Sequence, residues 1–132
     1  MRDITKYYGR NAGKIWVSLN TYGPQSQSSL IKKTKLTLQD FHTGIGWLAR
    51  ENKILKKGIL YNLGETNLTN IIGENAGKVW RLLESQGQVD ISSIARLSEI
   101  KIQDAYSALG WLAREDKIKI NGKDKHIKFG IK

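Results

Sequence analysis

The sequence contains no cysteine, which excludes disulfides and thiolate metal sites. Its only two histidines, His42 and His126, lack the paired spacing of a zinc site, so we expect neither a metal nor a cofactor. No apolar run approaches the roughly 20 residues that a membrane helix needs. The first residues also lack the apolar core of a secretory signal. These absences predict a cytoplasmic protein without a membrane partner.

Sequence signatures of catalysis are missing as well. Neither a glycine-rich phosphate loop nor a Ser–His–Asp arrangement can be identified by spacing. Acidic residues are few: 12 Asp and Glu stand against 22 Lys and Arg, a net charge of +10. Such an excess favours polyanionic partners, chiefly nucleic acid, although it also keeps a protein in solution without one. We therefore predict a binding protein and not an enzyme.

The sequence does contain an internal repeat. A shift of 64 residues lays positions 9–58 onto positions 73–122 without a gap, and 21 of the 50 aligned residues are identical. The longest identical block is 46–51, which matches 110–115. The period is long for a solenoid and only two copies occur, so each copy predicts a separate small domain. We place the boundary in the polar stretch 64–69, giving domains 1–66 and 67–132.

Apolar spacing predicts three helices in each copy. The first helix carries inward residues and ends at a glycine: Tyr8, Ala12, Ile15, Trp16, Leu19 and Gly23, repeated as Ile72, Ala76, Val79, Trp80, Leu83 and Gly87. A short second helix covers about 28–33 in the first copy and 92–97 in the second. Thr37 is the expected N-cap of the third helix. That helix has the inward residues Leu38, Phe41, Ile45 and Leu48, repeated as Ile102, Ala105, Leu109 and Leu112.

Short alternating strands follow the third helix in both copies. In the second copy, 117–120 and 126–131 flank an Asn121-Gly122 turn and a lysine-rich segment; in the first, 54–55 and 59–61 flank Lys56-Lys57-Gly58. Helix, short helix, turn, longer helix and basic hairpin together indicate a winged helix-turn-helix. The predicted fold class is α+β, mainly α, with two tandem winged helix-turn-helix domains of three helices and a β-hairpin wing each.

Two motifs also resemble a known family. They are Asn-Ala-Gly-Lys-x-Trp in the first helix and Gly-Trp-Leu-Ala-Arg-Glu-x-Lys-Ile where the third helix meets the wing. They are similar to a small prokaryotic winged helix-turn-helix family of uncharacterised function, for which the resemblance implies nucleic-acid binding. Members usually carry one such domain. The tandem pair departs from that pattern and suggests that an ancestral homodimer was fused into one chain.

In a helix-turn-helix, the start of the third helix enters the major groove while nearby basic residues contact phosphates. We therefore predict nucleic-acid-binding residues on and before the outward face of each third helix. They are Lys32, Lys33, Lys35, Gln39, His42 and Thr43 in the first copy, and Lys101, Gln103, Tyr106 and Ser107 in the second. A solvated polar face explains the same pattern. Asp40 and Asp104 would repel phosphates, and helix capping accounts for them better.

The wings make the stronger electrostatic argument. Their lysines are Lys53, Lys56 and Lys57 in the first copy, and Lys117, Lys119, Lys123, Lys125 and Lys128 in the second. Lysines on edge strands also guard against aggregation, which is the alternative explanation. Residues 1–66 hold 11 basic and 4 acidic residues, a net charge of +7, whereas residues 67–132 hold 11 and 8, a net charge of +3. The N-terminal copy is the expected main contact with DNA.

Four further residues form a candidate interface: Trp47, Trp111, Gly46 and Gly110. The other two tryptophans, Trp16 and Trp80, fall on the apolar face of the first helices and are expected in the core. Trp47 and Trp111 lie on the flank of the third helices, where either packing within a copy or an interface explains them. Gly46 and Gly110 sit inside predicted helices at a cost of about 1 kcal/mol each. The reason we expect is a close helix approach, within a copy or between copies.

These observations lead to three functional hypotheses. The first is a cytoplasmic DNA-binding protein, either a transcriptional regulator or a nucleoid-associated protein, that contacts duplex DNA with its third helices and basic wings. The alternative is a protein–protein docking module, because a fold does not fix a function. RNA binding fits the charge, but no aromatic stacking platform is visible. A homodimer or a protein partner stays open.

Overall fold

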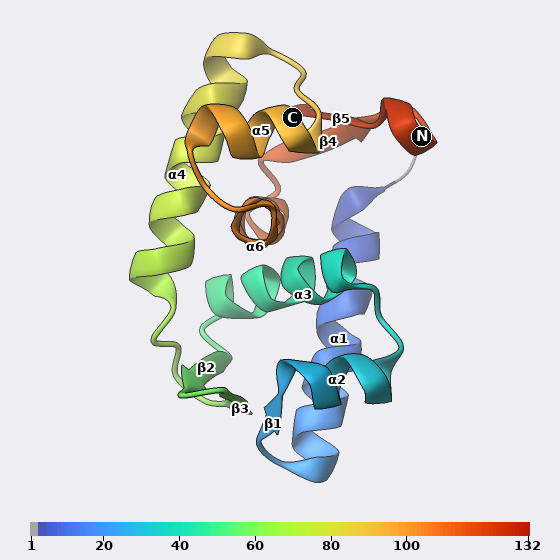
Figure 1. The fold of residues 1–132 in the computed structure, drawn as a ribbon, viewed down its shortest axis with the longest axis vertical. Helices are drawn as coiled ribbons and strands as arrows, with labels where there is room; N and C mark the ends of the chain where they lie inside the picture. Colours follow the sequence, from blue (N-terminus) through green and yellow to red (C-terminus); the bar gives the residue numbers. More distant parts are fainter. Residues whose placement is uncertain (1–2) are drawn as a thin grey trace.

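The computed structural model describes residues 3–132 and contains two copies of one arrangement (Figure 1). The elements of the first copy are α1 (Ile4–Tyr22), β1 (Gln25–Ser26), α2 (Gln27–Thr34), α3 (Leu38–Arg50), β2 (Ile54–Lys57) and β3 (Leu60–Leu63). Those of the second copy are α4 (Thr69–Gln86), α5 (Ile91–Ser98), α6 (Ile102–Arg114), β4 (Ile118–Asn121), the 3-10 turn η1 (Asp124–His126) and β5 (Lys128–Ile131). Three helices and a hairpin in each copy confirm the predicted fold class.

Capping residues mark the start of α3 and the ends of α1 and α4. The Thr37 side chain accepts a hydrogen bond from the backbone N–H of Asp40 at 3.1 Å, as expected for the N-cap of α3. Gly23 and Gly87 end α1 and α4 with φ angles of 81° and 83°. Residues other than glycine adopt that left-handed conformation only at a cost, which explains why both copies have glycine there.

The two wings differ in their turns. In the first wing, Lys57 pairs with Leu60 and only two residues connect β2 to β3; β1 adds a third strand beside β3. In the second wing, Asn121 pairs with Lys128, so a six-residue loop, 122–127, replaces the Asn-Gly turn expected from the sequence. Only an isolated bridge from Val89 to Phe129 takes the place of β1 there.

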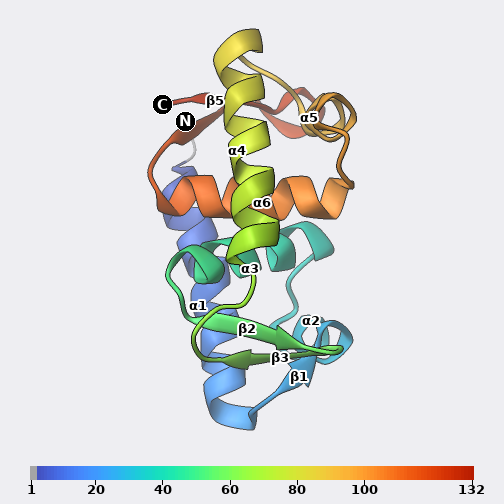
Figure 2. The same cartoon turned by 90° about the vertical axis from the view of Figure 1, so that its left-hand side faces the viewer.

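The third helices of the two copies lie side by side in the centre of the molecule (Figures 1 and 2). The long helices α1 and α4 stand on opposite sides of this central pair, and the wings lie towards opposite ends. α3 is therefore enclosed between α1 of its own copy and α6 of the other.

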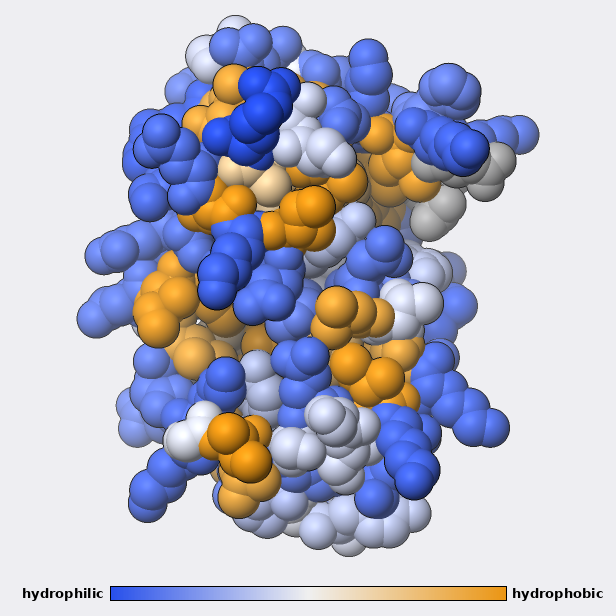
Figure 3. All heavy atoms as spheres, viewed as in Figure 1, coloured by the Kyte–Doolittle hydropathy of each residue, from blue (hydrophilic) through white to orange (hydrophobic). Residues whose placement is uncertain are grey.

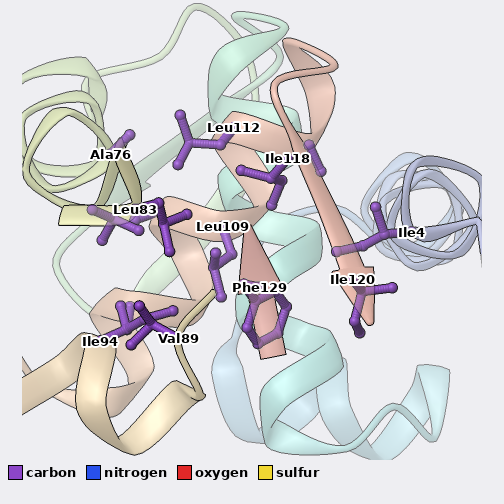
Figure 4. Close-up of a cluster of buried hydrophobic side chains, with 14 of the residues drawn as sticks. Ile4, Ala76, Leu83, Val89, Ile94, Leu109, Leu112, Ile118, Ile120 and Phe129 are labelled. Atoms are coloured by element: carbon purple, nitrogen blue, oxygen red, sulfur yellow. The ribbon is translucent and has the colours of Figure 1, made fainter. Parts of the chain in front are cut away.

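Each copy also contributes to the hydrophobic core of the other. Ile4 and Tyr8, from the start of α1, belong to the core of the second copy, and Figure 4 shows Ile4 reaching towards Ile118 and Ile120 of β4. Leu68 and Ile72, at the start of α4, belong to the core of the first copy. These residues correspond through the 64-residue repeat, so the exchange is reciprocal, and the two cores depend on each other.

Three residues expected in the core are exposed. Leu38 and Ile102 are each 50% exposed, because they lie in the first turns of α3 and α6, which project beyond the helices that cover the rest. Trp16 is 38% exposed, since Ala12, Ile15 and Leu19 form the inward stripe of α1 and leave Trp16 on its flank. Its counterpart Trp80 packs partly buried against the second core.

Candidate nucleic-acid interface

The central pair of helices makes its closest approach at two glycines. A Cβ atom added to Gly46 would lie 1.8 Å from the backbone oxygen of Ser107, and one added to Gly110 would lie 2.0 Å from that of Thr43. Ser107 and Thr43 correspond through the repeat, so the contact is the same from either copy. The close approach expected at these glycines thus lies between the copies, where α3 and α6 touch backbone to backbone.

Two reciprocal ion pairs close one end of this contact. Arg50 Nε lies 3.1 Å from Glu115 Oε2, and Arg114 Nε lies 3.0 Å from Glu51 Oε2. These ion pairs were not predicted from the sequence. The signal for them was the identical Arg-Glu dipeptide at the end of both third helices, which indicates a contact once the copies are related by a two-fold axis.

Trp47 and Trp111 lie beside these ion pairs. The Arg114 guanidinium lies 5.8 Å from the Trp47 ring, and that of Arg50 lies 5.8 Å from the Trp111 ring. Both indoles are half-buried and pack against both hydrophobic cores. They therefore link the two copies and do not form an exposed apolar surface for another protein.

The outward exposure expected for part of the third helices is wrong. His42, Thr43 and Ser107 are 6%, 1% and 6% exposed, and Tyr106 is half-buried. Sequence periodicity treats each copy alone and assigns these side chains to a solvent face, but in the structure the other copy covers that face. In this arrangement DNA cannot reach the three buried side chains.

His42 differs from its buried neighbours in lacking a partner. Its Nε2 atom is buried without a hydrogen bond among the described residues. Burial lowers the pKa of the imidazole; the Asp104 carboxylate opposes this shift, and the Lys56 ammonium adds to it. The position corresponds to Tyr106 in the second copy, so the two sides of the central contact carry different chemistry.

Among the positions predicted to contact bases, those at the starts of the third helices are exposed. Gln39, Lys101 and Gln103 are exposed, and together with Leu38 and Ile102 they line one shared groove of about 720 Å³. Figure 3 shows hydrophobic atoms near the middle of this face, where α5, α6 and the start of α3 meet, with hydrophilic atoms around them. The two helix starts thus open onto a single site.

Asp40 does not cap its helix with its carboxylate, contrary to expectation. The Tyr7 hydroxyl of α1 donates a hydrogen bond of 2.9 Å to Asp40 Oδ2. Tyr106 of the other copy lies close by: burial, and then the Asp40 charge, raise the pKa of its phenol. Sequence alone offered no signal for this group, because it forms only when α1 and α6 meet at α3.

Every lysine proposed as a phosphate contact is exposed. This set comprises Lys32, Lys33, Lys35, Lys53, Lys56, Lys57, Lys101, Lys117, Lys119, Lys123, Lys125 and Lys128. Lys53 and Lys117 lie at the bases of the wings, 3.7 Å from Glu51 and 3.4 Å from Glu115. Such exposed pairs are weak, but they reduce the local positive charge.

The comparisons with known proteins place this architecture in a family. A family model described as a winged helix-turn-helix domain (DUF2582) matches residues 1–59 and again residues 67–130. The chain belongs to this family. A Methanocaldococcus jannaschii protein, "Uncharacterized protein MJ1608", is 40% identical over 60 residues, which cover 41% of this chain and 80% of that protein. No solved structure matches the chain.

Over residues 3–132, no three His, Cys, Asp or Glu side chains gather as metal ligands would. None of the helices in that range has the length and apolar character needed to cross a membrane.

Proposed function

We propose that the protein binds duplex DNA along one face that carries the starts of α3 and α6 and the tips of both wings. The observation behind the proposal is their common orientation. In Figure 2, the first turns of α3 and α6 and the turns of both hairpins point to the same side, the right of the view. The exposed lysines near the tips, Lys56 and Lys57 in one wing and Lys123 and Lys125 in the other, give this face its positive charge.

The proposed contact differs from that of a standard helix-turn-helix dimer. Such dimers place their recognition helices in successive major grooves about 34 Å apart. Here both helix starts line one groove and most of each third helix is covered. We infer that phosphate contacts supply most of the affinity and that sequence preference is low. A nucleoid-associated role fits this mode better than recognition of a defined operator.

The test is a fluorescence anisotropy titration of a random duplex at salt concentrations from about 50 to 200 mM. We expect affinity to fall steeply with salt. The double variant K56A/K57A should flatten the slope of log K against log salt by about 0.9 for each lost phosphate contact.

The second wing supplies a matched control. K123A/K125A removes two exposed tip lysines from the copy with a net charge of +3. We expect it to lose less DNA affinity than K56A/K57A, which lies in the copy with a net charge of +7. Absence of binding at about 50 mM salt would contradict the proposal. A loss of DNA affinity without a change in the slope of log K against log salt would mean that these lysines do not contact phosphates.

A second candidate function is protein docking in the shared groove. Leu38 and Ile102, both half-exposed, occupy positions where DNA-reading helices carry polar side chains. If a partner protein docks there, L38S/I102S should abolish its binding and leave the salt-dependent affinity for DNA unchanged. No partner protein is needed to explain the lysines of the wing tips, so DNA binding is the preferred function.

A further inference from the structure

The tip of the first wing presents an apolar side chain to solvent. Ile59 is 76% exposed, the highest value among the large hydrophobic side chains of residues 3–132. Its turn, between β2 and β3, lies at the edge of the molecule, on the right of Figure 2. A single exposed apolar residue is common on protein surfaces. The surroundings of Ile59 therefore have to show whether it contacts a partner.

The hairpin fixes Ile59 at the very end of the wing. Lys57 pairs with Leu60, so Gly58 and Ile59 alone make the turn. Gly58 has a φ of 62°, the positive value that the first position of such a tight turn requires. The side chain of Ile59 thus projects from the shortest connection that two antiparallel strands can have.

Both edges of this hairpin are held by neighbouring segments. On one edge, β1 pairs with β3. On the other, the backbone N–H of Lys56 donates a hydrogen bond of 2.9 Å to Asn67 Oδ1, and Asn67 Nδ2 donates one of 2.7 Å to the Lys56 carbonyl. A contact made by a tip that is already ordered loses less entropy than one made by a flexible loop.

The charges around the tip are positive. Positions 52–64 hold three lysines and no acidic residue, and Glu51 and Glu65 flank this segment before and after the two strands. Lys56 and Lys57, next to the turn, are both exposed. Architectural proteins enter the minor groove of DNA with this combination, in which cations contact the backbone and an apolar wedge enters between base pairs.

The second wing lacks this combination. The repeat places Lys123 opposite Ile59, and the loop 122–127 replaces the two-residue turn. The isoleucine of that loop, Ile127, packs against the second hydrophobic core. Within the described residues, the first wing therefore has an apolar tip between lysines, and the second has a lysine at the matching position.

We propose that Ile59 enters the minor groove of duplex DNA, partly unstacks one base-pair step and bends the duplex. This inference rests on the proposed DNA binding and adds a bending activity to it. Insertion of this kind kinks DNA by about 20–90°. Pyrimidine–purine steps unstack most readily, so the first wing should select them although it reads no base edge. The second wing contacts phosphates without insertion.

Two fluorescence signals test the insertion, beside the anisotropy of the same duplex. A duplex of about 30 base pairs is much shorter than the persistence length of about 150, so it is nearly straight when free. Energy transfer between dyes at its ends should rise when the chain binds. 2-Aminopurine placed at central TA steps should brighten as its stacking is lost. Binding by anisotropy without either signal would overturn the insertion and leave the proposed function intact, whereas no binding would overturn both.

Variants at the tip separate the apolar contact from the charge. I59S should abolish both fluorescence signals and change the DNA affinity at most several-fold, because the lysines are kept. I59K installs the residue of the second copy and should also abolish the signals, while the slope of log K against log salt steepens by up to about 0.9. The matched control is I71S, which alters another exposed isoleucine, on α4, and should retain both signals.

Two results with these variants would overturn the proposal. One is persistence of both signals in I59S and I59K, which would mean that the DNA bends without Ile59. The other is binding of the chain to anionic phospholipid vesicles that I59S abolishes, with flat 2-aminopurine fluorescence on DNA, which would place the apolar tip in a lipid surface.

Discussion

The centre of the contact between the two copies and its flanks have diverged to different degrees. At the centre, each contact occurs twice: Gly46 approaches Ser107 as Gly110 approaches Thr43, and Arg50 pairs with Glu115 as Arg114 pairs with Glu51. The distances on the two sides agree within a few tenths of an ångström. On the flanks, one copy presents His42 where the other presents Tyr106. The longest identical block of the repeat, 46–51, coincides with the symmetric centre.

This difference indicates what each region does. The centre joins the copies through pairs of equivalent contacts, so a change in a central residue alters the contact between the copies. The flanks face different neighbours and are free to acquire different chemistry. Asymmetry around a symmetric centre is what we expect if two copies that pair as a dimer were fused into one chain and then specialised.

The largest predicted loss of stability comes from disrupting the central contact between α3 and α6. Gly46→Ala places a Cβ atom 1.8 Å from a backbone oxygen, so α3 and α6 have to separate. We expect a loss of about 3 kcal/mol in the free energy of unfolding, at the upper end of overpacking effects. Gly110→Ala should cost the same, since its Cβ would meet the equivalent oxygen at 2.0 Å. Urea unfolding measures both.

Gly13→Ala is the matched control for these variants. Gly13 also lies inside a helix, but a Cβ atom added there meets nothing within 4 Å. Relief from the backbone entropy of glycine should stabilise this variant by about 0.5–1 kcal/mol. If Gly46→Ala behaves like Gly13→Ala, the two third helices do not touch in solution.

The sequence predicted the parts of this molecule that depend on local spacing. Helix positions, the Thr37 cap, the glycine ends and the two hairpins follow from residues near one another in the chain. The second wing is the exception. Its Asn-Gly pair matches a tight turn, yet Gly122, with φ 89°, lies in a longer loop that contains η1. Local preference marked the place of the turn but not its length.

The pairing of the copies could not be predicted in the same way. Thr43 and Ser107 have the polar side chains of a solvent face, but they are buried where α3 and α6 meet, and Asn11 of α1 also donates a hydrogen bond to the Thr43 hydroxyl. Periodicity reports which side of a helix avoids water, but it does not report that a second domain covers the remaining side. The mid-helix glycines carried that information, since their cost predicted a close helix approach without naming the partner.

The second prediction uses the asymmetry of the flanks. Burial lowers the pKa of His42 from its usual 6.5, so the folded protein binds fewer protons than the unfolded chain in the range just below pH 6.5. The free energy of unfolding should be highest above about pH 6.5. It should decrease as the pH falls to about 5.5, by at most about 1.4 kcal/mol per pH unit for one proton. Chemical denaturation at pH 7.5 and 5.5 measures the loss.

Removing the imidazole isolates its contribution to this pH dependence. His42→Gln should flatten the dependence between pH 7.5 and 5.5, whatever its effect on stability at neutral pH. His126→Gln should preserve it, because His126 is exposed in η1. An unchanged slope in His42→Gln would assign the proton to another group.

The smallest predicted effect tests whether the two ion pairs are equivalent. Both arginines are 46% exposed at the side chain and both partner glutamates 18%, so each pair should contribute about 1 kcal/mol or less. A double-mutant cycle of R50A with E115A and another of R114A with E51A measure the two coupling energies. Because the Nε–Oε2 distances are 3.1 and 3.0 Å, the values should agree within error and decrease together at about 1 M salt. A measurable coupling energy in one ion pair alone would mean that the two copies differ at the centre of their contact as well as on its flanks.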